Sequence, residues 1–323
     1  MGQLVNGAWL ADDEQLRHAA GRFVRPESAF RNWITPDGAA GPSGAGGFKA
    51  ERGRYHLYVS LACPWAHRTI IFRALKRLDD AIGMSVTHWR SRERGWTFEP
   101  AEGVIADDVN GCDAIYQLYQ LADPAYSGRA TVPVLWDKAR RTIVNNESSE
   151  IIRMLNSAFD AIGAASGDYY PQPLRAQIDV INERVYRTLN NGVYRAGFAR
   201  SQQAYEEAVR PLFETLDWLE ERLAARRYLT GAALTEADWR LFTTLVRFDA
   251  VYYGHFKCNL RRIVDYPHLW GYTRDLYQHD GIAATVDLRH IKAHYYESHL
   301  RVNPTGVVPI GPQLDFDAPH GRG

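Results

Sequence analysis

The sequence predicts an α/β domain followed by an all-helical domain. Three observations lead to this fold class. The chain has 323 residues, 46% of them hydrophobic, so it can bury a large core and is long enough for two domains. Strand-like and helix-like runs alternate up to about residue 160. From about Leu174 onward, apolar residues follow helical spacing and no convincing strand is present.

The first 50 residues are expected to form an arm or covering loop. The run from Gly38 to Gly47 has too many glycines and too few periodic apolar residues for a regular element. The predicted divisions are this arm (1–50), the α/β domain (51–160), the helical domain (161–300) and an extended, proline-containing C-terminal tail (301–323).

The α/β domain is expected to run strand, helix, strand, helix, strand, strand, helix. The predicted bounds are 55–60, 64–78, 84–89, 112–121, 131–136, 142–144 and a helix that begins at 148. Strands that alternate with crossover helices indicate a partly parallel sheet, and the Asp137-Lys138 turn adds an antiparallel hairpin. This order is thioredoxin-like.

The second half shows helix signals of two kinds. Leu212, Phe213 and Leu216 begin an apolar stripe with charged residues on the opposite side. Thr235 and Asp238 have the spacing of a capping box, with Asp in place of the usual Glu or Gln. Both signals favour an all-α domain.

Composition restricts the partners and the compartment. Lys plus Arg and Asp plus Glu both total 38, so charge gives no reason to expect nucleic acid or an anionic membrane, and a small molecule is the expected partner. Three cysteines are too few for a disulfide scaffold and suit a reducing compartment. The first residues lack signal-peptide features and no apolar run reaches transmembrane length, so we expect a cytosolic location.

Cys63 lies between a predicted strand and a predicted helix. A thiol at a helix start meets unpaired backbone N–H groups and the positive end of the helix dipole, which favour the thiolate. Ala66 occupies the second position of a C-x-x-C motif, so Cys63 would have to exchange with an external thiol. The alternative is a buried cysteine that only fills space.

Pro133 interrupts the start of the strand predicted at 131–136. Because proline cannot donate to a β-ladder, it marks an edge strand or a cis turn. In a thioredoxin-like domain this proline is cis and faces the reactive cysteine, which leaves the backbone of Val132 available to a peptide-like thiol. An ordinary edge-strand proline is the alternative.

Glu147 and Ser148 lie where the next helix begins. They could be a plain N-cap. As a binding site, the free N–H groups would hold a ligand carboxylate while Glu147 takes a ligand ammonium, and an α-amino acid head group has both.

Two residue pairs have spacings that can bind a metal on a helix: Cys63 with His67, and His255 with Cys258. A structural zinc site needs four ligands, which two separate pairs do not supply, so no metal is expected. No glycine-rich nucleotide loop follows a predicted strand either.

Several segments carry a family resemblance. They are Cys-Pro-Trp-Ala-His-Arg (63–68), Thr-Val-Pro-Val-Leu-Trp-Asp (131–137), Asn-Asn-Glu-Ser-Ser-Glu-Ile (145–151), Asn-Asn-Gly-Val-Tyr (190–194), Tyr-Tyr-Gly-His-Phe-Lys-Cys (252–258), Asp-Tyr-Pro (265–267) and Asn-Pro-Thr-Gly (303–306). Together they resemble the glutathionyl-hydroquinone reductases, the xi class of glutathione transferases. The resemblance covers about residues 1 to 320.

The resemblance implies the glutathione transferase architecture, a homodimer, and glutathione as co-substrate without a metal. It implies that Cys63 is the nucleophile and that Pro133 has a structural role. The implied glutathione-binding residues are Trp96, Arg129, Ala130, Thr131, Val132, Glu147 and Ser148.

The resemblance also matches Tyr194 with the family's proton donor, and Tyr252 and Tyr295 with tyrosines whose hydroxyls support the Cys63 thiolate. The adjacent Tyr253 and Tyr296 are alternatives within the same motifs. Each of these tyrosines could instead be a core aromatic.

The implied activity is the reduction of glutathionyl-hydroquinones to hydroquinones through a Cys63–glutathione mixed disulfide, with release of oxidised glutathione. The first alternative is an omega-like thioltransferase or dehydroascorbate reductase, which needs no phenolic proton donor. The second is a non-catalytic binding or scaffold protein that keeps the fold.

Overall fold

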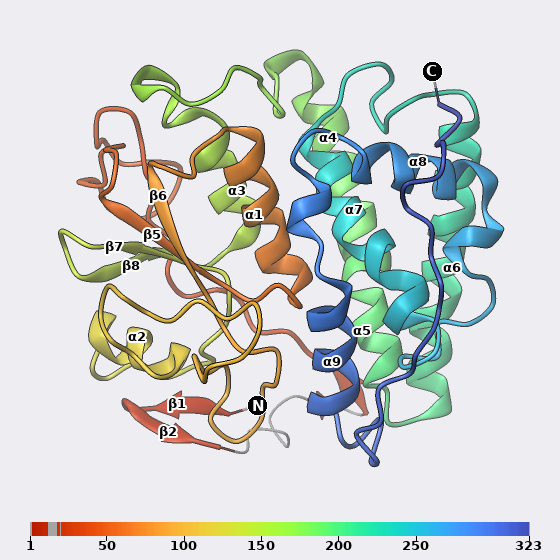
Figure 1. Cartoon of the computed structure of the whole chain (residues 1–323), viewed down its shortest axis with the longest axis horizontal. Coiled ribbons are helices and arrows are strands. Elements are labelled where there is room, and N and C mark those ends of the chain that lie inside the picture. Colours follow the sequence, from red (N-terminus) through yellow and green to blue (C-terminus); the bar gives the residue numbers. More distant parts are fainter. Residues whose placement is uncertain (1, 12–17, 20, 323) are drawn as a thin grey trace. The chain divides into compact units, whose positions relative to one another are not determined.

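A computed structural model describes residues 2–11, 18–19 and 21–322 (Figure 1). The described parts form two compact units. The first comprises residues 1–15 and 26–167, and the second comprises residues 16–25 and 168–323. The finer division into an arm, two domains and a tail stays a prediction.

The first unit contains a four-stranded sheet. Its strands are β5 (Tyr55–Val59), β6 (Ile82–Val86), β7 (Val134–Asp137) and β8 (Thr142–Asn145), in the order β6-β5-β7-β8. β5 pairs in parallel with β6 and antiparallel with β7, and β7 pairs antiparallel with β8. The partly parallel sheet and its closing hairpin are therefore confirmed.

Three helices belong to this sheet: α1 (Pro64–Leu75), α2 (Ile115–Ala122) and α3 (Ser148–Ser157). α1 and α3 pack side by side (Figure 1), and α2 packs against β8. Every residue of β5 is buried, as expected for a central strand covered on both faces. The interior of this unit thus surrounds β5 and supports the segments that leave its strands.

The strand predicted at 84–89 is present, but it begins and ends earlier, at Ile82–Val86. Gly83 belongs to this strand although glycine normally weakens a strand. A larger residue would not fit, because a Cβ at this position would lie 2.6 Å from Nδ1 of His56. The chain then leaves the sheet, and the backbone N–H of His88 donates to the carbonyl of Thr97 (2.8 Å).

The N-terminal region differs from the predicted covering loop. β1 (Gln3–Val5) and β2 (Ala8–Leu10) form an antiparallel hairpin. Its two turn residues, Asn6 and Gly7, have φ values of 47° and 77°, which the Asn-Gly pair adopts readily in a two-residue hairpin turn. The glycine-rich run from Gly38 to Gly47 contains no helix or strand, as predicted.

The second unit is built of helices, with one short hairpin of β3 (His18–Ala19) and β4 (Arg22–Phe23). The α-helices are α4 (Arg175–Val185), α5 (Gly192–Gly197), α6 (Gln202–Ala224), α7 (Glu236–Arg247), α8 (Pro267–Tyr277) and α9 (Leu288–Ser298). π-Helical turns extend α4 and α7, at Tyr186–Asn190 and Phe248–Tyr252. Such turns are frequent at functional sites. Among the described residues, no helix combines the length and the apolar character needed to cross a membrane.

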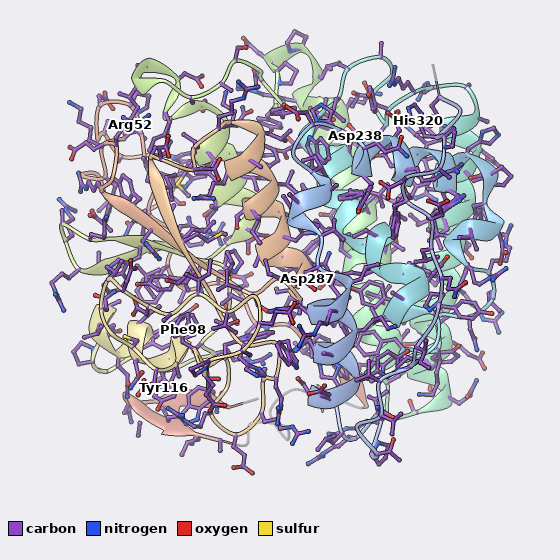
Figure 2. All side chains as sticks on the ribbon, in the orientation of Figure 1. Arg52, Phe98, Tyr116, Asp238, Asp287 and His320 are labelled. Atoms are coloured by element: carbon purple, nitrogen blue, oxygen red, sulfur yellow. The ribbon has the colours of Figure 1, made fainter. Side chains whose placement is uncertain are left out.

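The predicted capping box is confirmed at the start of α7. Asp238, labelled in Figure 2, accepts hydrogen bonds from the backbone N–H of Thr235 (2.8 Å) and of Leu229 (2.8 Å) and from the hydroxyl of Tyr272 (2.8 Å). Burial raises the pKa of this carboxyl, although its hydrogen bonds oppose the shift. Asp238 thus ties three segments of the helical unit together.

Candidate active site

Cys63 is the N-cap residue of α1 and has an extended backbone (φ −77°, ψ 121°). Pro64 takes the first helical position, where its missing N–H removes no helical hydrogen bond. The Cys63 thiol donates to the carbonyl of Val132 (Sγ–O 3.6 Å), and 9% of the residue is exposed. The cysteine therefore lies at a helix start, as predicted, and next to the segment before Pro133.

The peptide bond between Val132 and Pro133 is cis, as expected. Thr131, which precedes Val132, is held by Tyr119. The Tyr119 hydroxyl donates to the carbonyl of Thr131 (3.0 Å) and accepts from the N–H of Thr131 (3.2 Å). Further upstream, the Tyr126 hydroxyl donates to the carbonyl of Arg129 (3.4 Å). The buried aromatic residues of the first unit thereby hold the predicted glutathione-binding segment, 129–132, in place.

Glu147 is the N-cap of α3. Its Oε1 accepts from the backbone N–H of Ser149 (3.0 Å) and from the Ser149 hydroxyl (2.8 Å), and its Oε2 accepts from the hydroxyl of Ser28 (3.1 Å). Burial opposes ionisation, but these bonds and the nearby Arg68 guanidinium outweigh it and lower the pKa of Glu147. The side chain is therefore an anion at the start of a helix.

Arg68 lies beside Glu147 and Ser148, and no role was predicted for it. It is almost fully buried in α1, its guanidinium lies over the Trp65 ring (4.6 Å from Cζ to the centroid), and Nη1 donates weakly to Oγ of Ser148 (3.5 Å). Arg68 was part of the quoted Cys-Pro-Trp-Ala-His-Arg motif. Its spacing from Cys63 gave no reason to expect a buried cation beside Ser148 and Glu147.

Trp96 belongs to the long loop between β6 and α2. It is 7% exposed, and its carbonyl accepts from the backbone N–H of Ile115 (2.9 Å) at the start of α2. Ala130 is partly exposed within the predicted binding segment. Both residues belong to the first unit, with Cys63 and Glu147.

The second unit contains a chain of three phenols. The Tyr194 and Tyr295 hydroxyls are 2.5 Å apart, and those of Tyr252 and Tyr295 are 2.9 Å apart. Burial raises the pKa values of Tyr252 and Tyr295 well above the ordinary range. The three residues come from α5, from the π-helical turn after α7 and from α9.

The phenol chain distinguishes between neighbouring tyrosines. Tyr252 and Tyr295 are at most 1% exposed, whereas Tyr253 and Tyr296 are partly exposed. The ring of Tyr296 packs instead on His255 (centroids 4.8 Å apart). The hydrogen-bonded chain thus contains Tyr252 and Tyr295, and their assignment to the site stays a prediction.

The residues of one pair with metal-binding spacing, His255 and Cys258, have other surroundings. Burial raises the pKa of the Cys258 thiol, and His255 lies against His299 (Nε2–Nδ1 3.2 Å). Within the described residues, no cluster of three or more His, Cys, Asp or Glu side chains could hold a metal ion.

Comparison with known families defines the class of protein. The family model "Glutathione S-transferase, N-terminal domain" matches residues 62–158, and "Glutathione S-transferase, C-terminal domain" matches residues 202–275. A thioredoxin-like sheet and a helical unit, in this order, are the glutathione transferase architecture predicted from the sequence.

Individual relatives narrow the class. The glutathionyl-hydroquinone reductase YqjG of Escherichia coli (strain K12) is 58% identical over 323 residues, 100% of this chain and 98% of the relative. The reductase PcpF of Sphingobium chlorophenolicum is 57% identical over 97% of this chain and 96% of its own. The chain belongs to the glutathionyl-hydroquinone reductases, the xi class of glutathione transferases.

Solved structures agree with this assignment. The glutathione-bound structure of YqjG has a TM-score of 0.93 at 57% identity and covers 99% of both chains. A xi-class glutathione transferase from Natrialba magadii has a TM-score of 0.94 at 50% identity, covering 100% of this chain and 97% of its own.

Proposed function

We propose that this protein is an oxidoreductase that uses glutathione to reduce glutathionyl-hydroquinones to hydroquinones. The observation that carries the proposal is the position of Cys63 at the N-cap of α1, beside Val132, in a chain 58% identical along its whole length to a glutathionyl-hydroquinone reductase. Binding of glutathione is supported by the glutathione-bound structure of that relative.

Glutathione has an α-amino acid head group at its γ-glutamyl end and a peptide backbone around its cysteine. The carboxylate would bind at the start of α3, at the backbone N–H groups and Ser148, and the ammonium would pair with anionic Glu147. Val132 would hydrogen bond to the peptide backbone through its main chain. Trp96, Arg129, Ala130 and Thr131 would complete the binding surface.

The first chemical step is a proton transfer. An aryl thioether resists attack at sulfur because an aryl carbanion is a poor leaving group. Proton donation by Tyr194 to the ring carbon that bears sulfur, with loss of a ring hydroxyl proton, gives a keto tautomer. Tyr295, within hydrogen-bond distance, would support the Tyr194 phenolate left by this transfer.

The second step is attack on sulfur. The Cys63 thiolate forms an S–S bond with the glutathionyl sulfur as the carbon–sulfur bond breaks, and the electron pair leaves on a stabilised enolate that becomes the hydroquinone. A second glutathione thiolate then attacks the mixed disulfide, which releases oxidised glutathione and regenerates the Cys63 thiolate. Overall, one aryl carbon is reduced and two glutathione sulfurs are oxidised. The expected kinetic pattern is ping-pong.

The direct test follows free hydroquinone and oxidised glutathione chromatographically after incubation with glutathionyl-hydroquinone and glutathione. Wild type should release both products and Cys63→Ser neither. In a single turnover, Tyr194→Phe should release hydroquinone about 10²–10⁴-fold more slowly, because it lacks the general acid. Full single-turnover release by Tyr194→Phe would refute the proton-donor role.

The omega-like thioltransferase alternative is less favoured because the two curated relatives at 57% and 58% identity are reductases by name. Turnover of a small mixed disulfide without any hydroquinone release would restore it. We also propose a cytoplasmic homodimer. Light scattering during size-exclusion chromatography tests the dimer, and cell fractionation tests the location.

A further inference from the structure

Arg25 lies over the face of Tyr194. Its Cζ atom is 5.0 Å from the centroid of the phenol ring, within the range of a cation–π contact. Its Nε donates to Oδ1 of Asn191 (2.8 Å), which directs the guanidinium toward the ring. Sequence analysis placed Arg25 in a covering arm and gave it no role.

The segment that carries Arg25 is held on the helical unit by several contacts. Arg22 makes a two-bond contact with the carboxylate of Glu207 (2.9 and 3.0 Å), and the backbone N–H of Arg200 donates to the carbonyl of Gly21 (3.1 Å). Phe23 is 8% exposed and packs on Phe198 (centroids 5.3 Å apart). Figure 1 shows this short segment beside α5. Arg25 is therefore placed by the fold of the second unit.

Tyr194 also lies in an aromatic cluster. Its ring contacts Phe198, Phe256, Tyr252 and Tyr295. The positive charge of buried Arg247 favours the ionised forms of Tyr252 and Tyr295, against the larger effect of burial on their pKa values. The Tyr295 ring also contacts the rings of three histidines, His255, His294 and His299. A positive charge over a phenol stabilises its phenolate more than its neutral form, because the attraction to a full negative charge is larger.

We propose that Arg25 is a positioning residue for proton donation: it fixes the Tyr194 ring and stabilises the phenolate that forms when Tyr194 protonates the substrate carbon. This inference rests on the proposed function. Arg25 keeps its own proton throughout, and the charge that it stabilises arises only after the proton leaves Tyr194. Its contribution should therefore affect hydroquinone release, but not the later attack of glutathione on the Cys63 mixed disulfide.

The test is a single-turnover measurement of hydroquinone release by Arg25→Gln. We expect a loss of about 3- to 30-fold, the range that a cation–π contact provides. Arg25→Lys keeps the charge and should recover part of the rate. The matched control is Arg175→Gln, because Arg175 makes the same kind of contact in the same unit (4.9 Å from the Tyr170 ring) without contacting Tyr194.

Three further readouts separate this role from a structural one. Resolution of the preformed mixed disulfide by glutathione should stay within about twofold of wild type. The alkaline limb of the pH–rate profile for release, where Tyr194 loses its proton, should move to higher pH in Arg25→Gln. Adding Arg25→Gln to Tyr194→Phe should cause no further loss, since the acid that Arg25 serves is already absent.

Two kinds of failure are distinguishable. Wild-type release by Arg25→Gln, together with strongly slowed release by Tyr194→Phe, would overturn this inference and leave the proposed function standing. Equal losses in both half-reactions, or no recovery by Arg25→Lys, would also overturn it. Unimpaired release by Tyr194→Phe would overturn the donor role and the inference together.

Discussion

Two carboxylates at helix starts, one in each unit, have pKa values that are shifted in opposite directions. Glu147 caps α3, and Asp238 lies in the capping box of α7; both accept backbone N–H bonds. The pKa of Glu147 is lowered, whereas burial raises the pKa of Asp238. The difference shows that hydrogen bonds alone do not stop burial from raising the pKa of a carboxyl group. Glu147 also has the Arg68 guanidinium nearby.

The two carboxylates have different expected roles, Glu147 in ligand binding and Asp238 in stability. Glu147 keeps part of its surface exposed and its pKa is lowered, as the proposed binding of a ligand ammonium requires. Asp238 is completely buried, and the described groups that it contacts belong to its own unit. Changes to the two carboxylates should therefore have different consequences, one on affinity and the other on stability.

The largest effect is expected from Asp238→Ala. The change leaves buried donors on Leu229, Thr235 and Tyr272 without their acceptor, which should lower the free energy of unfolding by about 2–4 kcal/mol. Urea denaturation measures this loss. The exposed Asp317→Ala is the control and should stay within about 0.5 kcal/mol of wild type. A similarly small effect of Asp238→Ala would contradict the structural role.

Glu147→Gln should mainly reduce affinity. Loss of the charged partner for the γ-glutamyl ammonium should weaken glutathione binding about 10- to 100-fold, equivalent to about 1.5–3 kcal/mol for hydrogen bonds to a charged group. Isothermal titration calorimetry measures the affinity, with Glu99→Gln as an exposed carboxylate control from the same unit. If Glu147→Gln bound glutathione as tightly as wild type, the ammonium would have to bind elsewhere.

Arg68→Met tests why the two carboxylates differ. Without the guanidinium, the pKa of Glu147 should rise, so glutathione affinity should fall about 3- to 10-fold and should fall further as the solution is acidified toward pH 4.5. Arg68→Lys retains a positive charge and should bind more tightly than Arg68→Met. Equal affinity in these two variants would show that the charge of Arg68 is not the cause.

The smallest effect is the pH dependence of stability. The folded pKa of Glu147 is lowered, so its stabilisation is present above the unfolded pKa near 4.5 and is lost as pH falls. The folded pKa of Asp238 is raised, so its contribution is fullest below the unfolded pKa near 3.8 and diminishes as pH rises.

Urea denaturation of wild type, Glu147→Gln and Asp238→Asn between pH 4 and 7 measures both trends. The stability advantage of wild type over Glu147→Gln should narrow toward low pH. The corresponding advantage over Asp238→Asn should narrow toward high pH. If both stability differences changed with pH in the same direction, the opposite pKa shifts of Glu147 and Asp238 would be refuted.

The features that were predictable from the sequence depend on residues close together in the chain. Cys63 at a helix start, the cis bond before Pro133 and the Thr235–Asp238 capping box all follow from short motifs. The Asn6-Gly7 turn was equally local and was overlooked. The inclusion of Gly83 in β6 was not predictable locally, because its close approach is to His56, a residue on the neighbouring strand.

The parts that escaped prediction depend on distant contacts. Tyr194 and Tyr295 are separated by 101 residues, and Arg25 and Asn191 by 166, so no local pattern reveals either pair. The family resemblance supplied the three tyrosines, but nothing in the sequence pointed to the Arg25 contact. Arg68 was likewise unexpected, because a buried guanidinium is uncommon and depends on partners from another helix.

The chain passes between the two units three times, near residues 15, 25 and 167. During synthesis, the described residues of 16–25 leave the ribosome long before their partners Asn191 and Glu207, which lie 166 and 185 residues downstream of Arg25 and Arg22. At about 5–20 residues per second, this delay is roughly 10–40 seconds. The first unit, which ends at residue 167, is synthesised completely in that interval, whereas β4 cannot pack against α5 until α5 is made. The segment of Arg22 and Arg25 is thus made early but is among the last parts of the chain to reach its native contacts.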